Sequence, residues 1–160
     1  MKSLLFAPNF QEHDVPGGFG LQNERLLKVA LNGEIMARQG IMAYRALQLG
    51  VLGGMAKGEI AYDAGAAQKA ADNLAASAAI DESMLWPKGS DTTANPDSEA
   101  LPKIWEDGSD VGERHKVLAD AAAAMQAAAG KDLDSLKAAM GPVGEACGGF
   151  QAVLDPELFV

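Results

Sequence analysis

The feature that most constrains this 160-residue chain is a regular spacing of apolar side chains near its C-terminus. Apolar residues recur there at alternating steps of three and four positions, the spacing of a helix face that packs against a partner. One helix cannot bury such a face alone, so other helices must cover it. The residues on this face are Leu133, Leu136, Met140, Val143, Cys147, Phe150 and Leu154.

Three earlier segments also carry helical signals, in a chain rich in alanine and with only 6% aromatic residues. A long helix is expected from about residue 33 to 57, with Lys57-Gly58 as its last turn and C-cap. Asp63 and Asp110 are expected to cap the next two helices, and Asp132 or Asp134 the fourth. The buried stripe of the first helix is expected at Ile35, Met36, Gln39, Met42, Ala46, Leu49 and Met55.

Connection lengths favour an all-α fold, an antiparallel four-helix bundle. The links at 58–62 and 130–132 are short, whereas 82–109 forms a long irregular loop that Trp86 and Trp105 are expected to pin to the bundle. The predicted division is an irregular or poorly ordered extension with a short helix (1–31) ending at a turn or new cap at Asn32-Gly33, a bundle domain (32–154) and a tail (155–160).

Charge and composition exclude several classes of function. A net charge of −9 disfavours nucleic acid, which repels acidic proteins. No apolar run reaches the roughly 18 to 20 residues that span a bilayer. The start resembles a secretory signal, but polar residues from Asn9 to Asp14 interrupt it, so no convincing signal peptide is present. A single cysteine excludes an internal disulfide.

The chain offers little for catalysis. Its only imidazoles are His13 and His115, and the charged neighbours Arg114 and Lys116 predict that His115 faces solvent. Neither histidine is expected to act as a metal ligand. No Ser/His/Asp set, metal-spaced His/Glu pair or phosphate-binding glycine loop is present, so the chain is not expected to be an enzyme.

Several short motifs resemble the cytochrome c′ family, including its low-spin, six-coordinate relatives. The resemblance covers about residues 34 to 147. It rests on Ala37-Arg38-Gln39-Gly40-Ile41-Met42, Met55-Ala56-Lys57-Gly58-Glu59, Trp86-Pro87-Lys88-Gly89-Ser90, Ala100-Leu101-Pro102-Lys103-Ile104-Trp105, Gly130-Lys131-Asp132-Leu133 and Met140-Gly141 through Val143-Gly144.

The family attaches haem c through Cys-x-x-Cys-His at the end of the fourth helix. Cys147 matches the first cysteine, but Phe150 stands at the second cysteine and Gln151 at the histidine that binds iron. The resemblance therefore implies, at most, a single thioether at Cys147, with Phe150 filling the second position. It further implies that Arg38 meets a haem propionate, that Met42 is the distal iron ligand and that Trp86 lines the pocket.

Two functions remain open at this stage. The resemblance implies a periplasmic haem protein for electron transfer or small-gas binding, impaired in haem attachment, with a redox partner protein and a homodimeric state. The alternative is a haem-free bundle that acts as a structural or binding module, in which Cys147 is a small buried apolar residue. Similarity fades before about residue 32 and after Cys147, a pattern that a reading-frame or gene-boundary error, or genuine decay, would produce.

Overall fold

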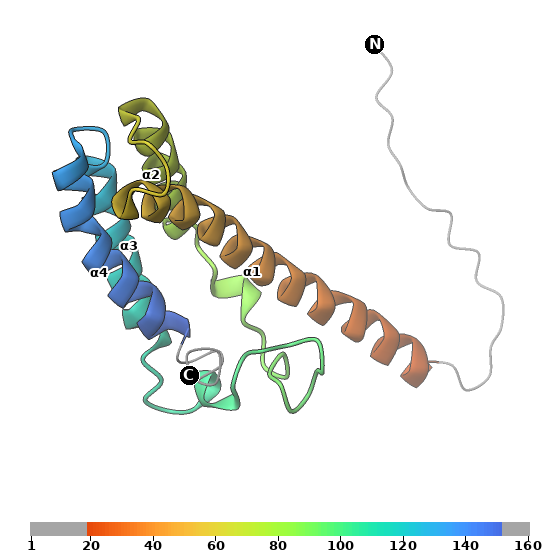
Figure 1. Ribbon diagram of the computed structural model, residues 1–160. Coiled ribbons are helices and arrows are strands. Elements are labelled where there is room, and N and C mark those ends of the chain that lie inside the picture. The colour runs from red at the N-terminus through yellow and green to blue at the C-terminus, as the bar shows by residue number, and fades with distance from the viewer. Residues whose placement is uncertain (1–18, 152–160) are drawn as a thin grey trace, which may run out of the picture.

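A computed structural model describes the backbone of residues 19–151 and the side chains of residues 32–150. The helices in this part of the chain form the expected antiparallel bundle, each beside the next and the first also against the fourth (Figure 1). No strand occurs between residues 19 and 151. The elements are α1 (Phe19–Lys57), α2 (Ala64–Ala78), the short 3-10 helices η1 (Ser83–Leu85) and η2 (Pro102–Trp105), α3 (Val111–Ala128) and α4 (Leu133–Gln151).

Two of the predicted helix caps are confirmed. The side chain of Asp63 accepts a hydrogen bond from the backbone N–H of Ala66 at 2.7 Å, at the start of α2. The side chain of Asp132 accepts a hydrogen bond from the backbone N–H of Ser135 at 2.7 Å. Asp132, rather than Asp134, is therefore the cap of α4. These bonds satisfy N–H groups that a helix start would otherwise leave without partners.

The predicted cap at the end of α1 is confirmed, whereas the predicted side-chain cap at the start of α3 is not. Asp110 precedes α3 but its side chain makes no capping bond. Its carboxylate instead pairs with Arg114 at 2.7 Å, because a charged partner one turn away competes with the backbone. Gly58 ends α1 as predicted, in a left-handed conformation (φ 78°) that favours glycine.

The turn or new cap expected at Asn32-Gly33 is absent, since α1 runs without a break from Phe19 to Lys57. Gly33 keeps a negative φ and is therefore not a turn glycine. Asn and Gly inside a helix cost no more than about 1 kcal/mol each, which the flanking helical residues can offset. The N-terminal part of α1 extends beyond the other helices in Figure 1.

The face of α4 predicted from its spacing is buried. Leu136, Val143 and Phe150 are almost fully enclosed, and Cys147 is half-buried on the same face. Leu154 lies outside the described residues. The main core joins this face to small side chains of α2 and α3, and its buried members are Leu52, Met55, Ala67, Ala70, Ala71, Leu74, Ala78, Leu118, Ala121, Ala122, Met125, Ala129, Leu136, Val143 and Ala146.

The buried face of α1 differs from the predicted stripe. Met36, expected inside, is 70% exposed, and Gln39 and Ala46 are exposed as well. The buried side chains follow a face displaced around the helix, on which two arginines occupy interior positions. This face consists of Ile35, Arg38, Arg45, Leu52 and Met55, with Met42 and Leu49 half-buried between them.

The long loop is pinned to the bundle as expected. The indole N–H of Trp105 donates to the carbonyl oxygen of Trp86 at 2.9 Å, and the two rings lie 6.3 Å apart. Ala100 and Ile104 bury themselves against these aromatic rings in a small second core. The loop thereby closes the end of the bundle that lies below α4 in Figure 1.

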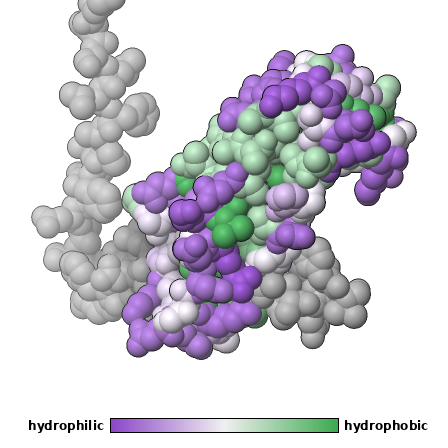
Figure 2. Space-filling model, turned by 90° about the vertical axis from the view of Figure 1, so that its left-hand side faces the viewer, coloured by the Kyte–Doolittle hydropathy of each residue, from purple (hydrophilic) through white to green (hydrophobic). Residues whose placement is uncertain are grey.

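One face of the molecule is only weakly hydrophobic. Figure 2 shows a broad pale-green area between hydrophilic (purple) residues, as expected when alanine covers much of the helices. Within residues 19–151, none of the helices combines the length and hydropathy needed to cross a bilayer.

Candidate functional site

Cys147, the chain's single cysteine, lies near the end of α4 against the main core. Burial raises the pKa of its thiol, and the positive charge of Arg45 opposes this effect. A thiol with a raised pKa is protonated and unreactive at neutral pH. Without an attached group, Cys147 therefore behaves as a small apolar residue.

Phe150 lies one turn after Cys147 on the same face of α4, and only 1% of it is exposed. Its ring meets that of Trp86 in an edge-to-face arrangement, with centroids 6.3 Å apart and planes at 79°. On another side the ring of His115 lies 6.3 Å away at 58°. Such aromatic pairs add about 0.5–1.5 kcal/mol beyond burial. Phe150 thus joins α4 to both the long loop and α3.

Arg38 is buried and uses its guanidinium to hold the long loop. Nη1 donates to the carbonyl of Leu85 (3.1 Å) and to Oγ of Ser90 (2.8 Å). Nη2 donates to the carbonyl of Ser90 (2.6 Å) and to Oγ of Ser98 (2.7 Å). The guanidinium also lies 4.6 Å from the centre of the Trp86 ring, a cation–π contact. Burial lowers the pKa of Arg38, and the nearby charge of Glu34 opposes this.

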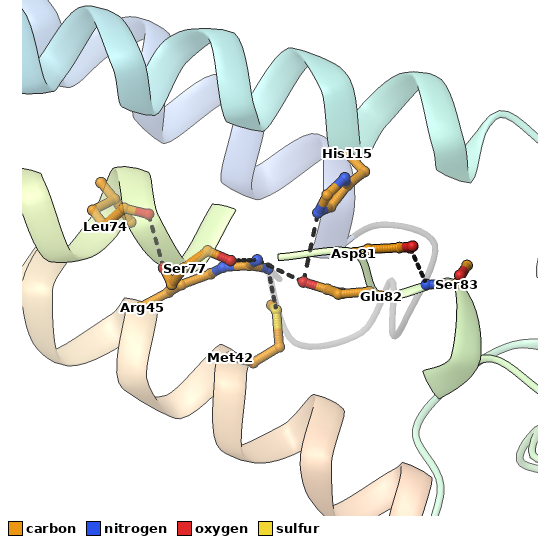
Figure 3. A network of polar contacts seen from close by, with 8 residues as sticks. All are labelled: Met42, Arg45, Leu74, Ser77, Asp81, Glu82, Ser83 and His115. Carbon is orange, nitrogen blue, oxygen red and sulfur yellow. Dashed lines mark hydrogen bonds and ion pairs between the residues drawn. The ribbon is translucent and has the colours of Figure 1, made fainter. Parts of the chain in front are cut away.

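Met42 and Arg45 lie one turn apart on the inner face of α1 (Figure 3). Nη1 of Arg45 donates to the Sδ of Met42 at 3.9 Å. Nη2 donates to the carbonyl of Ser77 at 2.6 Å and to Oε1 of Glu82 at 2.5 Å. The thioether of Met42 therefore points toward a guanidinium.

Glu82 stands between Arg45 of α1 and His115 of α3 (Figure 3). The side chains of Arg45 and Glu82 are only 3% and 6% exposed. Nε2 of His115 lies 3.5 Å from the same Oε1 of Glu82, and the imidazole is 28% exposed. Two nitrogens of this group, Nε of Arg45 and Nε2 of His115, are buried without a hydrogen-bond partner.

The prediction that His115 faces solvent is wrong. Helical periodicity places His115 three positions before the buried Leu118, on the inner side of α3. Its charged neighbours in sequence point elsewhere, because residues adjacent in a helix lie about 100° apart. Arg114 reaches back to Asp110 and the carbonyl of Gly149, and Lys116 reaches Asp120.

A hollow of about 490 Å³ opens beside Phe150, between the end of α2 and the start of α3. Phe150 is one wall of this space and does not fill all of it. Most of the lining is apolar, and the imidazole of His115 and the carboxylate of Glu82 are among the polar parts. The lining residues include Ala78, Ile80, Glu82, Trp86, Val111, His115, Ala119 and Phe150.

Three of the predicted site residues are thus in direct contact, since Arg38 packs on Trp86 and Trp86 on Phe150. Met42 joins them only indirectly, through the polar group around Arg45. Gln151 is the last residue of α4, and its side chain lies outside those that the structure describes.

Sequence reasoning missed Arg45, Glu82, Ser90 and Ser98, all of which are buried. Arg45 could have been found, because it follows Arg38 by seven positions and therefore lies on the same face of α1. The other three sit in the loop, where spacing carries no such signal.

An antiparallel all-α bundle whose long loop packs an aromatic ring against the end of its last helix, which also carries a half-buried thiol, has the architecture of the helical-bundle cytochromes. The family model described as Cytochrome C' matches residues 33–149. The chain belongs to the cytochrome c′ family.

Relatives agree with this assignment. Over 114 residues, the chain is 52% identical to cytochrome c-554 of Cereibacter sphaeroides, covering 71% of this chain and 74% of that protein. It is 35% identical over 113 residues to cytochrome c′ of the same species, covering 71% and 76%. The solved structure of a cytochrome c′ from Rhodobacter sphaeroides aligns with a TM-score of 0.73 at 32% identity, over 77% of this chain and 95% of that one.

The side chains present here fit a haem in part. Sulfur and imidazole groups are the ligands that haem iron takes, and Cys147, Met42 and His115 carry such groups. Of these three residues, only His115 lines the hollow beside Phe150. The hollow falls within the range of about 300–1,000 Å³ typical of small-molecule sites. A second thioether does not fit, because Phe150 at that position has no thiol and is fully buried.

Proposed function

We propose that this chain is a haem c protein for electron transfer or small-gas binding, in which Cys147 forms the single covalent link to the haem. The observation that carries the proposal is the continuous set of contacts from Arg38 through Trp86 to Phe150, beside Cys147 on α4. These are the positions at which the resemblance implies haem contacts.

Attachment is impaired in this proposal, because each departure from the family motif removes a specific interaction. Phe150 cannot form the second thioether. Gln151 offers a neutral amide, which is a poor iron ligand. Met42 supplies a thioether at the distal position, and Arg38 faces a propionate there only if it exchanges part of its bonding to Ser90 and Ser98.

The proposal includes the context that family membership favours. We expect the chain to act in the periplasm as a carrier rather than an enzyme, with a redox protein as its partner and with neither nucleic acid nor membrane bound. A homodimer through α1 and α2 has support in an apolar groove of about 410 Å³ between these helices, lined in part by Ile41, Tyr44 and Ile80.

The test is expression with the cytochrome c maturation machinery, followed by an absorption spectrum and an intact mass. The wild-type chain should gain the mass of one haem and a Soret band, and Cys147→Ser should lose both. The double variant Phe150→Cys with Gln151→His restores the full motif, so a larger fraction of it should carry covalently bound haem. This variant is the positive control, because its loading would show that the maturation machinery accepts this bundle.

A wild-type chain of unmodified mass beside a loaded double variant would sink the proposal. That result would instead support the second candidate, a haem-free bundle acting as a structural or binding module. One observation already favours this candidate, since the guanidinium of Arg38 finds its acceptors within the protein, on Leu85, Ser90 and Ser98.

A further inference from the structure

A groove of about 430 Å³ lies between α3 and α4, which run side by side (Figure 1). Its lining is mostly apolar and includes Val117 of α3, which is 48% exposed, and Pro142 of α4. Three acidic residues also line this α3–α4 groove, and all three are exposed: Asp110, Glu113 and Glu145. The chain thus presents an exposed apolar strip together with negative charge.

The positive charge within the α3–α4 groove is already paired. Among the described residues that line the groove, Arg114 is the only basic one. Its guanidinium pairs with the carboxylate of Asp110 at 2.7 Å, and Nη1 donates to the carbonyl oxygen of Gly149 at 2.6 Å. Three carboxylates and one guanidinium leave the lining with a net negative charge.

The loop that leads into α3 adds to this negative field. Residues 89–110 contain six acidic residues and one basic residue, so these 22 residues carry −5 of the chain's net charge of −9. The last of them, Asp110, lines the groove, and Asp97, Glu99, Glu106 and Asp107 are exposed. A field concentrated in this way attracts a partner of opposite sign and raises its rate of association.

We propose that the α3–α4 groove is the docking site for a basic electron-transfer protein, one that presents an apolar side chain surrounded by lysine or arginine residues. The inference rests on the proposed function, because it names the surface and the chemistry of the redox partner. Ala146 and Gly149 line the groove and are the neighbours of Cys147 and Phe150 in α4. A partner in the groove contacts the same turn of α4 that carries Cys147, and a short separation favours electron transfer.

Charge favours such a partner over the other occupants. A second copy of this chain is itself acidic, so it suits the α1–α2 groove better, since none of the described residues that line that groove is charged. Residues 152–160, which follow α4, include Asp155 and Glu157 and no basic residue, so this segment also has the wrong sign. A basic partner combines charge complementarity at the rim with apolar contact at the centre, the usual anatomy of a protein interface.

The test uses a basic cytochrome c as the probe and measures its affinity for the full chain by calorimetry at low ionic strength. Glu113→Lys with Glu145→Lys should weaken binding about 10-fold or more. The matched control is Glu59→Lys with Asp134→Lys, two exposed carboxylates outside the lining of the groove. The control changes the net charge by the same amount, but it should weaken binding much less. Equal losses in the two double variants would overturn the proposal.

A second arm tests the apolar part of the groove and the identity of its occupant. Val117→Asn keeps the charge and should weaken binding about 3-fold or more, because less apolar surface is buried. Photoreactive benzoylphenylalanine at position 117 should crosslink to the probe, as mass spectrometry would map. Crosslinks to residues 152–160 or to a second copy, with the probe present, would overturn the proposal. Glu113→Gln with Glu145→Gln serves if the lysine variant fails to fold by circular dichroism.

The outcomes separate this inference from the proposed function, because binding is measured on the chain with and without haem. A wild type that loads haem but binds the probe equally in the groove and control variants overturns the groove alone. An unloaded wild type that binds through the groove overturns the haem proposal and supports a binding module. A wild type that neither loads nor binds the probe overturns both.

Discussion

The buried charged side chains among residues 32–150 have partners outside their own helix, and the Arg45–Glu82 pair shows the consequence most clearly. Both side chains are almost fully buried, and the pair connects α1 to the segment after α2. Glu82→Gln should lower the free energy of unfolding by about 3–5 kcal/mol, because it leaves the charge of Arg45 buried without a counter-charge. Urea unfolding followed by circular dichroism measures the loss.

The control is Asp120→Asn, which removes the partner of Lys116 in an exposed ion pair on α3. Exposed pairs contribute little, so the unfolding midpoint should hardly move. Equal losses in the two variants would show that burial of the Arg45–Glu82 pair does not matter.

The buried thiol of Cys147 gives a second prediction at this scale. Because burial raises the pKa of the folded thiol above its ordinary value of 9.0, the unfolded thiol ionises first as pH rises. The contribution of Cys147 to stability is therefore complete below that value and lost as pH rises through the folded pKa. In the haem-free chain, iodoacetamide should label Cys147 more slowly than in urea at pH 8, as mass spectrometry would detect. Equal rates would contradict the burial of the thiol.

At the scale of elements, Arg38 of α1 holds the long loop through four hydrogen bonds and a ring contact. Arg38→Lys keeps the charge but loses the planar fork that reaches several acceptors at once. Each buried acceptor left without a donor should cost about 1–3 kcal/mol. The loop should then be cut faster in limited proteolysis, with cleavage mapped between residues 86 and 105.

Gln39→Ala is the matched control for this change, since Gln39 donates only one exposed hydrogen bond to the same loop, at the carbonyl of Asp97. Its proteolysis should resemble that of the wild type. A loop as resistant in Arg38→Lys as in the control would show that packing of Trp86, and not the guanidinium, holds it.

The helices differ in how well the sequence predicts which of their faces is buried. The buried face of α4 was predicted because Leu136, Val143 and Phe150 are all apolar, so spacing and chemistry agree. On α1 they disagree: Arg38 and Arg45 occupy interior positions while Met36 is exposed. Apolar spacing cannot find a face whose interior arginines are hydrogen-bonded by residues 32 to 60 positions away.

The site repeats this contrast. Cys147 and the positions of Phe150 and Gln151 could be placed from the motif, because their spacing is fixed within one helix. The spacing of His115 to Leu118 could have placed it on the inner side of α3. Its contact with Phe150 could not be predicted, because Phe150 lies 35 positions further along the chain, on another helix. Contacts between helices depend on how the bundle closes, which local patterns do not encode.

For the molecule as a whole, the exposed apolar side chains of α1 predict self-association. Met36, Tyr44 and Leu47 are exposed on this helix, beside the groove that α1 forms with α2. Tyr44→Glu should weaken a dimer about 10-fold or more, because it would bury a charge without a partner. Analytical ultracentrifugation over a range of concentrations would measure the shift.

Val117→Glu provides the comparison, because Val117 is exposed on α3, away from the lining of that groove. It should leave the dimerisation constant unchanged. A chain that is monomeric at every concentration, or equal effects of the two substitutions, would rule out this groove as the interface.

The bonds of Arg38 also have a kinetic consequence. They join residues 47 to 60 positions apart, whereas α1 and α2, and likewise α3 and α4, are linked by short turns. Closing so long a loop costs chain entropy before the hydrogen bonds of Arg38 can form. Helices that are close in sequence should therefore pair first on the folding pathway. Interactions that form after the rate-limiting step act mainly on the unfolding rate. Arg38 therefore governs how long the folded protein lasts more than how quickly it is reached.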